Sequence, residues 1–286
     1  MDPALARRLW TAIEPYHVLV YFAPEARGAY RQIGLKGYWM GYFASRAAPM
    51  GPVPPEVVTA TFFNFHPAMV RRAVPDAWSF APLDRILAAR SEVADAALRR
   101  ILGEDVASPA VREAAQLGRQ AAEAADPAGR PLFAGHASLP WPDDPHLALW
   151  HAATLLREHR GDGHTASLLT SGLDGCQAHV TLVAAGGQVR GTIQPNRGWS
   201  DEDWGRAEDD LRRRGWLDAG GALTQVGREG REAVEHRTDE LAMGPWERAG
   251  AGAAERLVEL VTPLSARIVA SGEVPVPNPA GWPGPS

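Results

Sequence analysis

The pattern of apolar and polar positions along the chain is mostly helical, and capping residues mark two helix starts. A serine followed by a proline opens an alanine-rich stretch and predicts a helix over 108–125. Ser200 stands three residues before Asp203, an arrangement typical of a capping box. This arrangement predicts a helix that runs to Arg214 and ends at Gly215.

The rest of the second half continues the helical pattern, with one exception. We expect a helix over 146–159, one or two helices over 165–185, and a helix over 225–243. The segment 216–224 consists of two short apolar runs about an Asp/Gly turn, which predicts a β-hairpin. The expected order is therefore helix, helix, helix, hairpin, helix.

The chain also repeats itself, which changes how its motifs are interpreted. Several first-half segments recur in the second half, most of them 138 residues later: Leu9–Ala12 as Leu149–Ala152, Gly34–Gly37 as Gly172–Gly175, Trp78 as Trp216, and Arg90 as Arg228. We interpret these matches as a divergent tandem duplication.

The second copy resembles a known regulator family. Arg214-Gly215-Trp216 precedes the expected hairpin, and Leu223–Glu229, with its Leu-Thr-x-x-Gly-Arg pattern, follows it. In this spacing, residues 199–241 resemble the winged-helix domain of MarR-like transcriptional regulators. The whole chain is also similar to an actinobacterial group described as helix-turn-helix or MarR-like, through the segment Arg157–His164. For that group the resemblance implies a fold more than a function.

We therefore expect a mainly α fold with a small β-hairpin wing, built from tandem, duplicated winged-helix-like domains. In the first copy Pro75 lies near the end of the corresponding helix and no hairpin follows, so this copy is expected to be a degenerate winged helix. Prolines and glycines interrupt 126–146, which predicts an irregular linker. The expected divisions are 1–103 and 148–272 as domains, 104–147 as a connecting helix and linker, and 273–286 as a disordered proline-rich tail.

Composition narrows the class of protein. The 286 residues are 45% hydrophobic and 22% charged, with a formal charge of -5, which is typical of a soluble globular chain. The single cysteine excludes an intrachain disulfide. The apolar run Val18–Ala23 is too short for a signal-peptide core or a membrane span. We expect a cytoplasmic protein that contacts no membrane and forms a homodimer if it acts as a regulator.

The helix before the expected wing is unsuited to a polyanion. From 200 to 217 there are six acidic residues against four arginines, and three of the acids occupy the first turn. Acids there stabilise the helix through its dipole but repel phosphates. DNA binding is therefore possible but disfavoured, and in that alternative the contacts would come from Arg206, Arg212 and Arg213.

The densest polar group in the sequence is His159–His164, between two apolar helices. Two glycines allow a tight turn there, and Asp162 could fix the tautomer of His164 for proton transfer, with Arg160 as a polar ligand contact. The alternative is structural: the segment is a turn and N-cap, with Arg160 closing the preceding helix.

Aromatic residues dominate two segments of the first copy, 38–43 and 62–67. Large rings with a few polar groups suit a planar or hydrophobic small molecule, although such runs also form ordinary cores. Asn64 or His66 could equally cap a helix that starts at Pro67. The candidate lining consists of Tyr30, Trp39, Tyr42, Asn64, His66 and Trp150.

The sequence provides no anchor for other chemistries. The histidines lack metal-ligand spacing, so no metal site is expected, and no phosphate-binding loop, dinucleotide turn or hydrolase elbow occurs, which leaves the cofactor unknown. We interpret the chain as a binding protein for a small hydrophobic or aromatic molecule, with proton transfer by His164 and Asp162 if it is an enzyme. A MarR-like, ligand-responsive DNA-binding regulator is the alternative.

Overall fold

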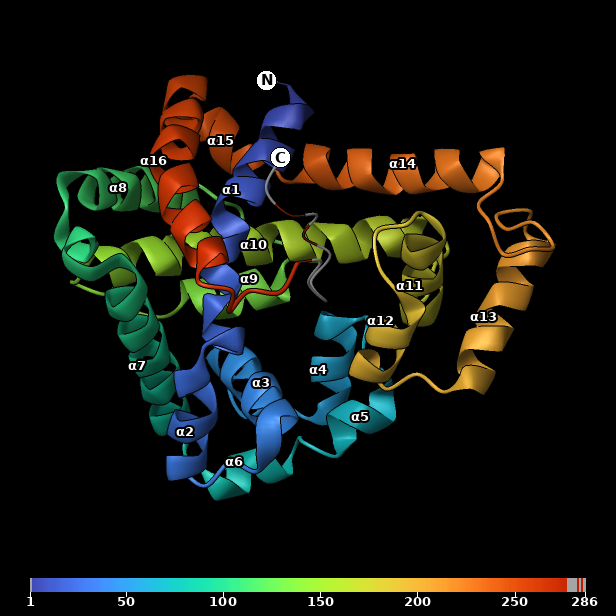
Figure 1. The fold of residues 1–286 in the computed structure, drawn as a ribbon, viewed down its shortest axis with the longest axis horizontal. Helices are drawn as coiled ribbons and strands as arrows, with labels where there is room; N and C mark the ends of the chain where they lie inside the picture. The colour runs from blue at the N-terminus through green and yellow to red at the C-terminus, as the bar shows by residue number, and fades with distance from the viewer. Residues whose placement is uncertain (1, 277–281, 283, 285–286) are drawn as a thin grey trace.

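The computed structural model describes residues 2–276 together with Trp282 and Gly284, and within them the chain is helical (Figure 1). The first half contains α1 (Pro3–Phe22), α2 (Pro24–Gln32), α3 (Gly37–Ala47), η1 (Ala48–Met50), α4 (Pro55–Phe62), α5 (Pro67–Arg71), α6 (Asp76–Phe80), α7 (Leu83–Leu102), η2 (Gly103–Ala107) and α8 (Pro109–Glu123). The second half contains α9 (Pro131–Ala137), α10 (Pro145–Thr170), α11 (Gly175–Ala184), α12 (Arg190–Arg197), α13 (Asp201–Arg213), α14 (Gln225–Leu241), α15 (Gly244–Ala249) and α16 (Ala251–Ala270).

The cap signals in the sequence are confirmed. Ser108 accepts a hydrogen bond from the Val111 amide at the start of α8. Ser200 and Asp203 form the expected reciprocal capping box at the start of α13. Local side-chain chemistry is sufficient to fix such helix starts, because the partners lie within three residues of each other.

The predicted β-hairpin wing is wrong, and with it the fold of tandem winged-helix-like domains. Across the described residues no strand forms, and the segment 216–224 keeps one isolated antiparallel bridge, Leu217 to Leu223. Both ends of the segment are engaged by α14: the Thr224 hydroxyl caps this helix, and the Trp216 ring is buried against its Gly230. These contacts leave little of the segment free to form a hairpin. The part of the chain that the structure describes is therefore all helical.

Two further expectations about local structure are corrected. The segment 159–164 is neither a turn nor a cap, because α10 runs through it without a break. Gly163 allows close packing there: a Cβ atom would lie 2.9 Å from Arg130 Nη1 and 3.2 Å from Leu241 Cβ. The linker predicted over 126–146 also contains a helix, α9, which begins at Pro131.

The C-terminal segment is partly described. Val274 and Trp282 are buried, and the Trp282 indole donates a hydrogen bond to the Thr11 carbonyl at 3.1 Å. Most of the tail predicted over 273–286 lies outside the described residues.

Two hydrophobic cores are joined by two helices. The first core takes side chains from α1 to the N-terminal half of α10, up to Leu156, and from residue 242 onward. The second runs from Leu168 to Val234 and holds the α11–α13 group. In Figure 1, α10 and α14 lie side by side and reach from one core to the other. The stretch of α10 between Leu156 and Leu168 lies between the cores and holds buried polar side chains, among them Glu158, Arg160 and Asp162.

Candidate functional site

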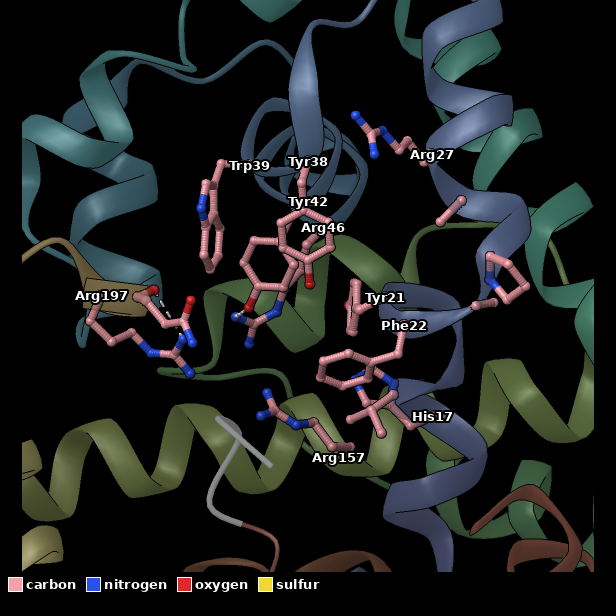
Figure 2. A pocket seen from close by; sticks show the side chains of 15 residues that line it. His17, Tyr21, Phe22, Arg27, Tyr38, Trp39, Tyr42, Arg46, Arg157 and Arg197 are labelled. Carbon is pink, nitrogen blue, oxygen red and sulfur yellow. Dashed lines mark hydrogen bonds between the residues drawn. The ribbon is translucent and has the colours of Figure 1, made fainter. Parts of the chain in front are cut away.

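The central feature is a cavity of about 480 Å³ between α1, α2, α3, α10 and α12 (Figure 2). His17 and Tyr21 on α1 are four residues apart and therefore face it together. Tyr38, Tyr42 and Arg46 follow the same spacing on α3. Arg157 enters from α10, and Arg197 enters from α12. Arg27 is contributed by α2, so the site is assembled from five helices, three near the N-terminus and two in the second half of the chain.

One wall of the cavity is aromatic. Tyr42 packs edge-on against Tyr21, with ring centroids 5.0 Å apart, and against Trp39 at 5.7 Å. Tyr38 stacks with Tyr42 at 6.4 Å and keeps 45% of its surface exposed, so it stands at the cavity rim. This wall offers flat apolar surface and phenolic hydroxyls, which suit a planar ligand.

The other wall is cationic. Four arginines line the cavity, Arg27, Arg46, Arg157 and Arg197, and no aspartate or glutamate does so among the described residues. The Arg197 guanidinium also lies 4.5 Å over the Phe65 ring. Positive charge held in a partly enclosed apolar site attracts an anion more strongly than the same charge in water.

The arginines are held from behind by one carboxylate. Arg46 binds Glu158 through Nε and Nη2, both at 2.8 Å, and Arg157 Nη1 contacts the same carboxylate at 2.8 Å. Burial alone would raise the pKa of Glu158, but the two guanidinium groups hold the pKa well below its ordinary value. One carboxylate is thus shared between two guanidinium groups.

Glu14 is a second buried carboxyl group beside the arginines. Its carboxylate is fully buried, accepts a hydrogen bond from the Trp10 indole at 2.9 Å, and lies 3.6 Å from Arg157 Nε. Burial raises the pKa of Glu14, and the charge of Arg157 only partly offsets this rise.

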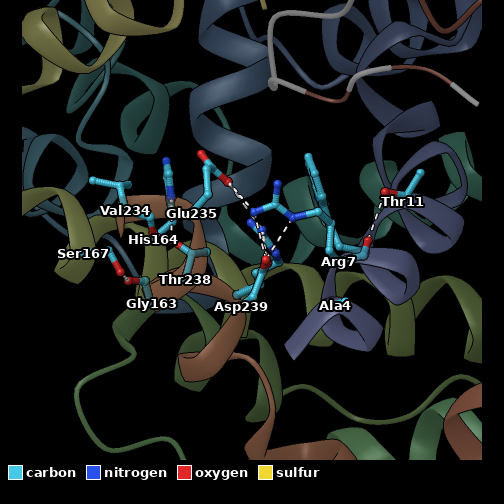
Figure 3. A network of polar contacts seen from close by, with 12 residues as sticks. Ala4, Arg7, Thr11, Gly163, His164, Ser167, Val234, Glu235, Thr238 and Asp239 are labelled. Carbon is cyan, nitrogen blue, oxygen red and sulfur yellow. Dashed lines mark hydrogen bonds and ion pairs between the residues drawn. The ribbon is translucent and has the colours of Figure 1, made fainter. Parts of the chain in front are cut away.

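A second cavity, of about 370 Å³, adjoins the first and shares Tyr42, Arg46, Arg157 and Arg197 with it. It holds much of the polar layer between the two cores (Figure 3). Asp239 of α14, behind the lining residues Arg160 and Arg7, accepts hydrogen bonds from them at 2.7 Å and 2.9 Å. These contacts join α1, α10 and α14.

The structure places the predicted catalytic pair in this second cavity but does not join the two residues. Asp162 accepts a hydrogen bond from the Phe133 amide at 2.9 Å, whereas His164 Nδ1 lies 2.9 Å from the Thr238 hydroxyl. Burial raises the pKa of Asp162 to about 6 and lowers that of His164 to about 4. Arg160 also lines this cavity, with its guanidinium 4.4 Å over the Trp10 ring.

The predicted aromatic lining is divided among several sites. Trp39 and Tyr42 line the central cavity, and Tyr30 lines a neighbouring cavity of about 260 Å³. Asn64 lines the second cavity.

Two members of that set have structural contacts. His66 caps α5 through its ring nitrogen and stands against Trp199. Trp150 is buried, with the Arg90 guanidinium 4.5 Å over its ring.

Sequence reasoning missed His17, Tyr21, Arg46 and Arg197. His17 and Tyr21 lie on an otherwise apolar face of α1, which is typical of a core. The one available signal for Arg46 was its position four residues after Tyr42, which puts both on one helix face. Only the packing of the helices reveals that they share a cavity.

The alternative DNA contacts lie on α13, and all three are paired on the helix itself. Arg206 binds Glu202 and Asp203, and Arg213 binds Asp210. Arg212 binds Glu208 and Asp209 at 3.3 and 2.9 Å. Their positive charge is therefore largely compensated within α13.

Other site types find no support among residues 2–276, Trp282 and Gly284. No group of three or more histidine, cysteine or acidic side chains there could hold a metal ion. None of the helices over the same residues combines the length and apolar character that crossing a membrane requires.

Comparison with known proteins gives one family. The model of a helix-turn-helix family matches residues 6–275, nearly the whole chain. No curated protein and no solved structure matches the chain.

Proposed function

Because the chain belongs to the helix-turn-helix family, we propose that it uses this helical scaffold to bind a small organic anion with an aromatic or hydrophobic body. The observation that carries the proposal is the central cavity, where arginines face a wall of tyrosine and tryptophan and no carboxylate is among the described lining residues. The anionic group would lie against Arg157 and Arg197, and the ring against Trp39 and Tyr42.

Size and charge both favour this ligand class. A cavity of about 480 Å³ lies in the range of small-molecule sites, roughly 300–1,000 Å³. A carboxylate or phosphate would give Arg157 a further partner beside Glu14 and Glu158, the second of which it shares with Arg46. The adjoining cavity, with Arg160, Asp162 and His164, offers further polar contacts to a longer ligand.

The test compares cinnamate with its uncharged analogue cinnamamide, by calorimetry and by thermal shift. Cinnamate is expected to bind and to raise the melting temperature, and the amide is expected to bind much more weakly. Equal binding of the two compounds would contradict the proposal, because the arginines would then contribute nothing.

A substitution locates the site. Arg157→Gln is expected to weaken cinnamate binding about 10- to 100-fold, because it removes a charged hydrogen-bond donor. The variant should remain folded, since Arg46 still pairs with Glu158. Arg112→Gln, an exposed position on α8, is the matched control and should leave affinity unchanged. Equal affinity in the two variants would place the ligand elsewhere.

A second candidate function is DNA-binding regulation, which the family match favours. The contacts would come from Arg206, Arg212 and Arg213, although acids of the same helix pair with each of them. A gel shift on random duplex at low salt tests it, because nonspecific phosphate binding is strongest there. A shift lost when all three arginines become glutamine would support this function. No shift at any concentration would leave the cavity as the functional site.

The remaining expectations stay predictions. They are the division at residues 103, 147 and 272, a homodimer, a location in the cytoplasm, and the finer resemblance to MarR-like regulators and to an actinobacterial group.

A further inference from the structure

His17 is a buried side chain with one unused nitrogen in the wall of the central cavity. The residue has no exposed surface, and it lines the cavity on the α1 side (Figure 2). Its Nδ1 lies 3.1 Å from the Thr154 hydroxyl of α10, while its Nε2 has no hydrogen-bond partner among the described residues. Burying a ring nitrogen without a partner is unfavourable, so such a group in a cavity wall points to a ligand.

The surroundings favour a neutral imidazole with a free lone pair. Burial lowers the pKa of His17 well below its ordinary value, and the positive charge of Arg157 lowers it further. The ring is therefore uncharged at neutral pH. When Nδ1 donates its hydrogen to Thr154, the lone pair is on Nε2.

Groups that stabilise negative charge line the same cavity. Tyr21 packs edge-on against both His17 and Tyr42, with centroids 5.6 and 5.0 Å apart, and so places the base and the phenol on adjoining parts of the wall. The Tyr42 hydroxyl contacts Arg46 Nη1 at 3.2 Å, and Arg157 stands beside them. A base next to fixed hydrogen-bond donors is the arrangement that removes a proton from carbon and holds the resulting oxyanion.

We propose that His17 is a general base for proton transfer at the carbon next to a carbonyl group in a bound aromatic carboxylate. This inference rests on the proposed function, since the arginines must first hold the ligand. The C–H bond breaks, its proton bonds to Nε2, and its electrons form a carbon–carbon double bond while the carbonyl electrons move to oxygen. The imidazolium either returns this proton to a conjugated carbon, which isomerises the ligand, or first trades it for a hydrogen from solvent water and delivers that hydrogen to the original carbon, which exchanges the position. No other reactant is consumed, and the outcome is exchange or isomerisation.

Phenylpyruvate is a suitable probe, because it combines an aromatic ring, a carboxylate and an acidic C–H next to a ketone. Deuterium incorporation at its C3 is followed by proton NMR in heavy water, and its binding is measured separately by calorimetry. Wild-type protein is expected to exchange this position faster than buffer. His17→Gln is expected to lose about 100-fold or more of the rate, while its affinity for phenylpyruvate is retained.

Two further variants separate catalysis from structure. His151→Gln removes another buried histidine, which lies on α10 outside the cavity lining, and should leave exchange unchanged. Thr154→Val removes the partner that positions the ring, and should lower the rate and change its pH profile without changing the affinity.

The outcomes distinguish this inference from the function on which it rests. Binding without accelerated exchange, or equal exchange in wild type and His17→Gln, would overturn the role of His17 and leave ligand binding intact. Failure of phenylpyruvate and cinnamate to bind at all would overturn both.

Discussion

Arg46 of α3 and Glu158 of α10 form a two-pronged ion pair, with both N–O distances at 2.8 Å, although they are 112 residues apart in sequence. The Arg46 side chain is 9% exposed and the Glu158 side chain is fully buried. The pair fixes α3, which provides the aromatic wall, against α10, which provides Arg157. The geometry of the cavity therefore depends on this contact.

Replacing Glu158 with glutamine is expected to lower the free energy of unfolding by about 3–5 kcal/mol, because the change removes the carboxylate that pairs with buried Arg46 and with Arg157. Urea denaturation followed by circular dichroism measures the loss. The control is Glu123→Gln, which breaks an exposed pair with Arg119 and should cost about 1 kcal/mol or less. Similar losses in the two variants would mean that the buried pair has no special role.

Replacing Asp162 with asparagine is expected to raise the free energy of unfolding, whereas replacing Glu158 with glutamine lowers it. Its pKa is raised by burial to about 6 in the folded chain, above the ordinary value of 3.8, so folding favours the protonated form. Its contribution is therefore most favourable below pH 4 and is lost as the pH rises through 6. Relative to wild type, Asp162→Asn should gain stability between pH 4 and pH 8, by up to about 3 kcal/mol at roughly 1.4 kcal/mol per pKa unit.

The measurement is a set of urea curves at several pH values for both proteins. The asparagine side-chain oxygen can still accept the hydrogen bond from the Phe133 amide, so the comparison isolates the effect of the Asp162 charge. A stability difference that does not vary with pH would mean that Asp162 is ionised in the folded chain throughout this range.

Features fixed by short-range chemistry could be predicted from the sequence, and those fixed by packing could not. The caps at Ser108 and Ser200 follow from side chains that bond within three residues. The expected wing failed because its outcome depends on α14: Gly227 and Gly230 allow Trp216 to dock there, which no local pattern in 216–224 encodes. Tertiary contacts commonly override strand propensity in this way.

The same division applies to the site. Trp39 and Tyr42 were identified because aromatic side chains are conspicuous in the sequence. His17 and Arg46 were missed, since a histidine or an arginine gains chemical meaning only from its neighbours. Those neighbours, Thr154 and Glu158, lie more than a hundred residues away in the chain. Contacts across such separations are set by helix packing rather than by any motif.

His164 makes the protein sensitive to acid. Burial lowers its pKa from 6.5 to about 4, so the folded chain favours the neutral ring. Its contribution to stability is fully present above pH 6.5 and is lost as the pH falls toward 4. Between pH 7 and pH 4 this residue alone should account for a loss of up to about 3 kcal/mol, at roughly 1.4 kcal/mol per pKa unit. His164→Gln should lose less stability over that range in urea titrations, whereas parallel curves would contradict the assignment.

Two glycine substitutions test how the segment before α14 is held. In Gly227→Ala the new Cβ atom would lie 2.1 Å from the Trp216 carbonyl oxygen, a backbone atom that cannot move aside alone. Such overpacking is expected to cost about 1–3 kcal/mol, measured by urea denaturation. A Cβ atom added at Gly205, inside α13, would meet no other group within 4 Å, so Gly205→Ala should stabilise the chain by about 0.5–1 kcal/mol through helix propensity alone. If both variants gained stability, Trp216 would not be seated on α14, and the docking that replaces the wing would have to be abandoned.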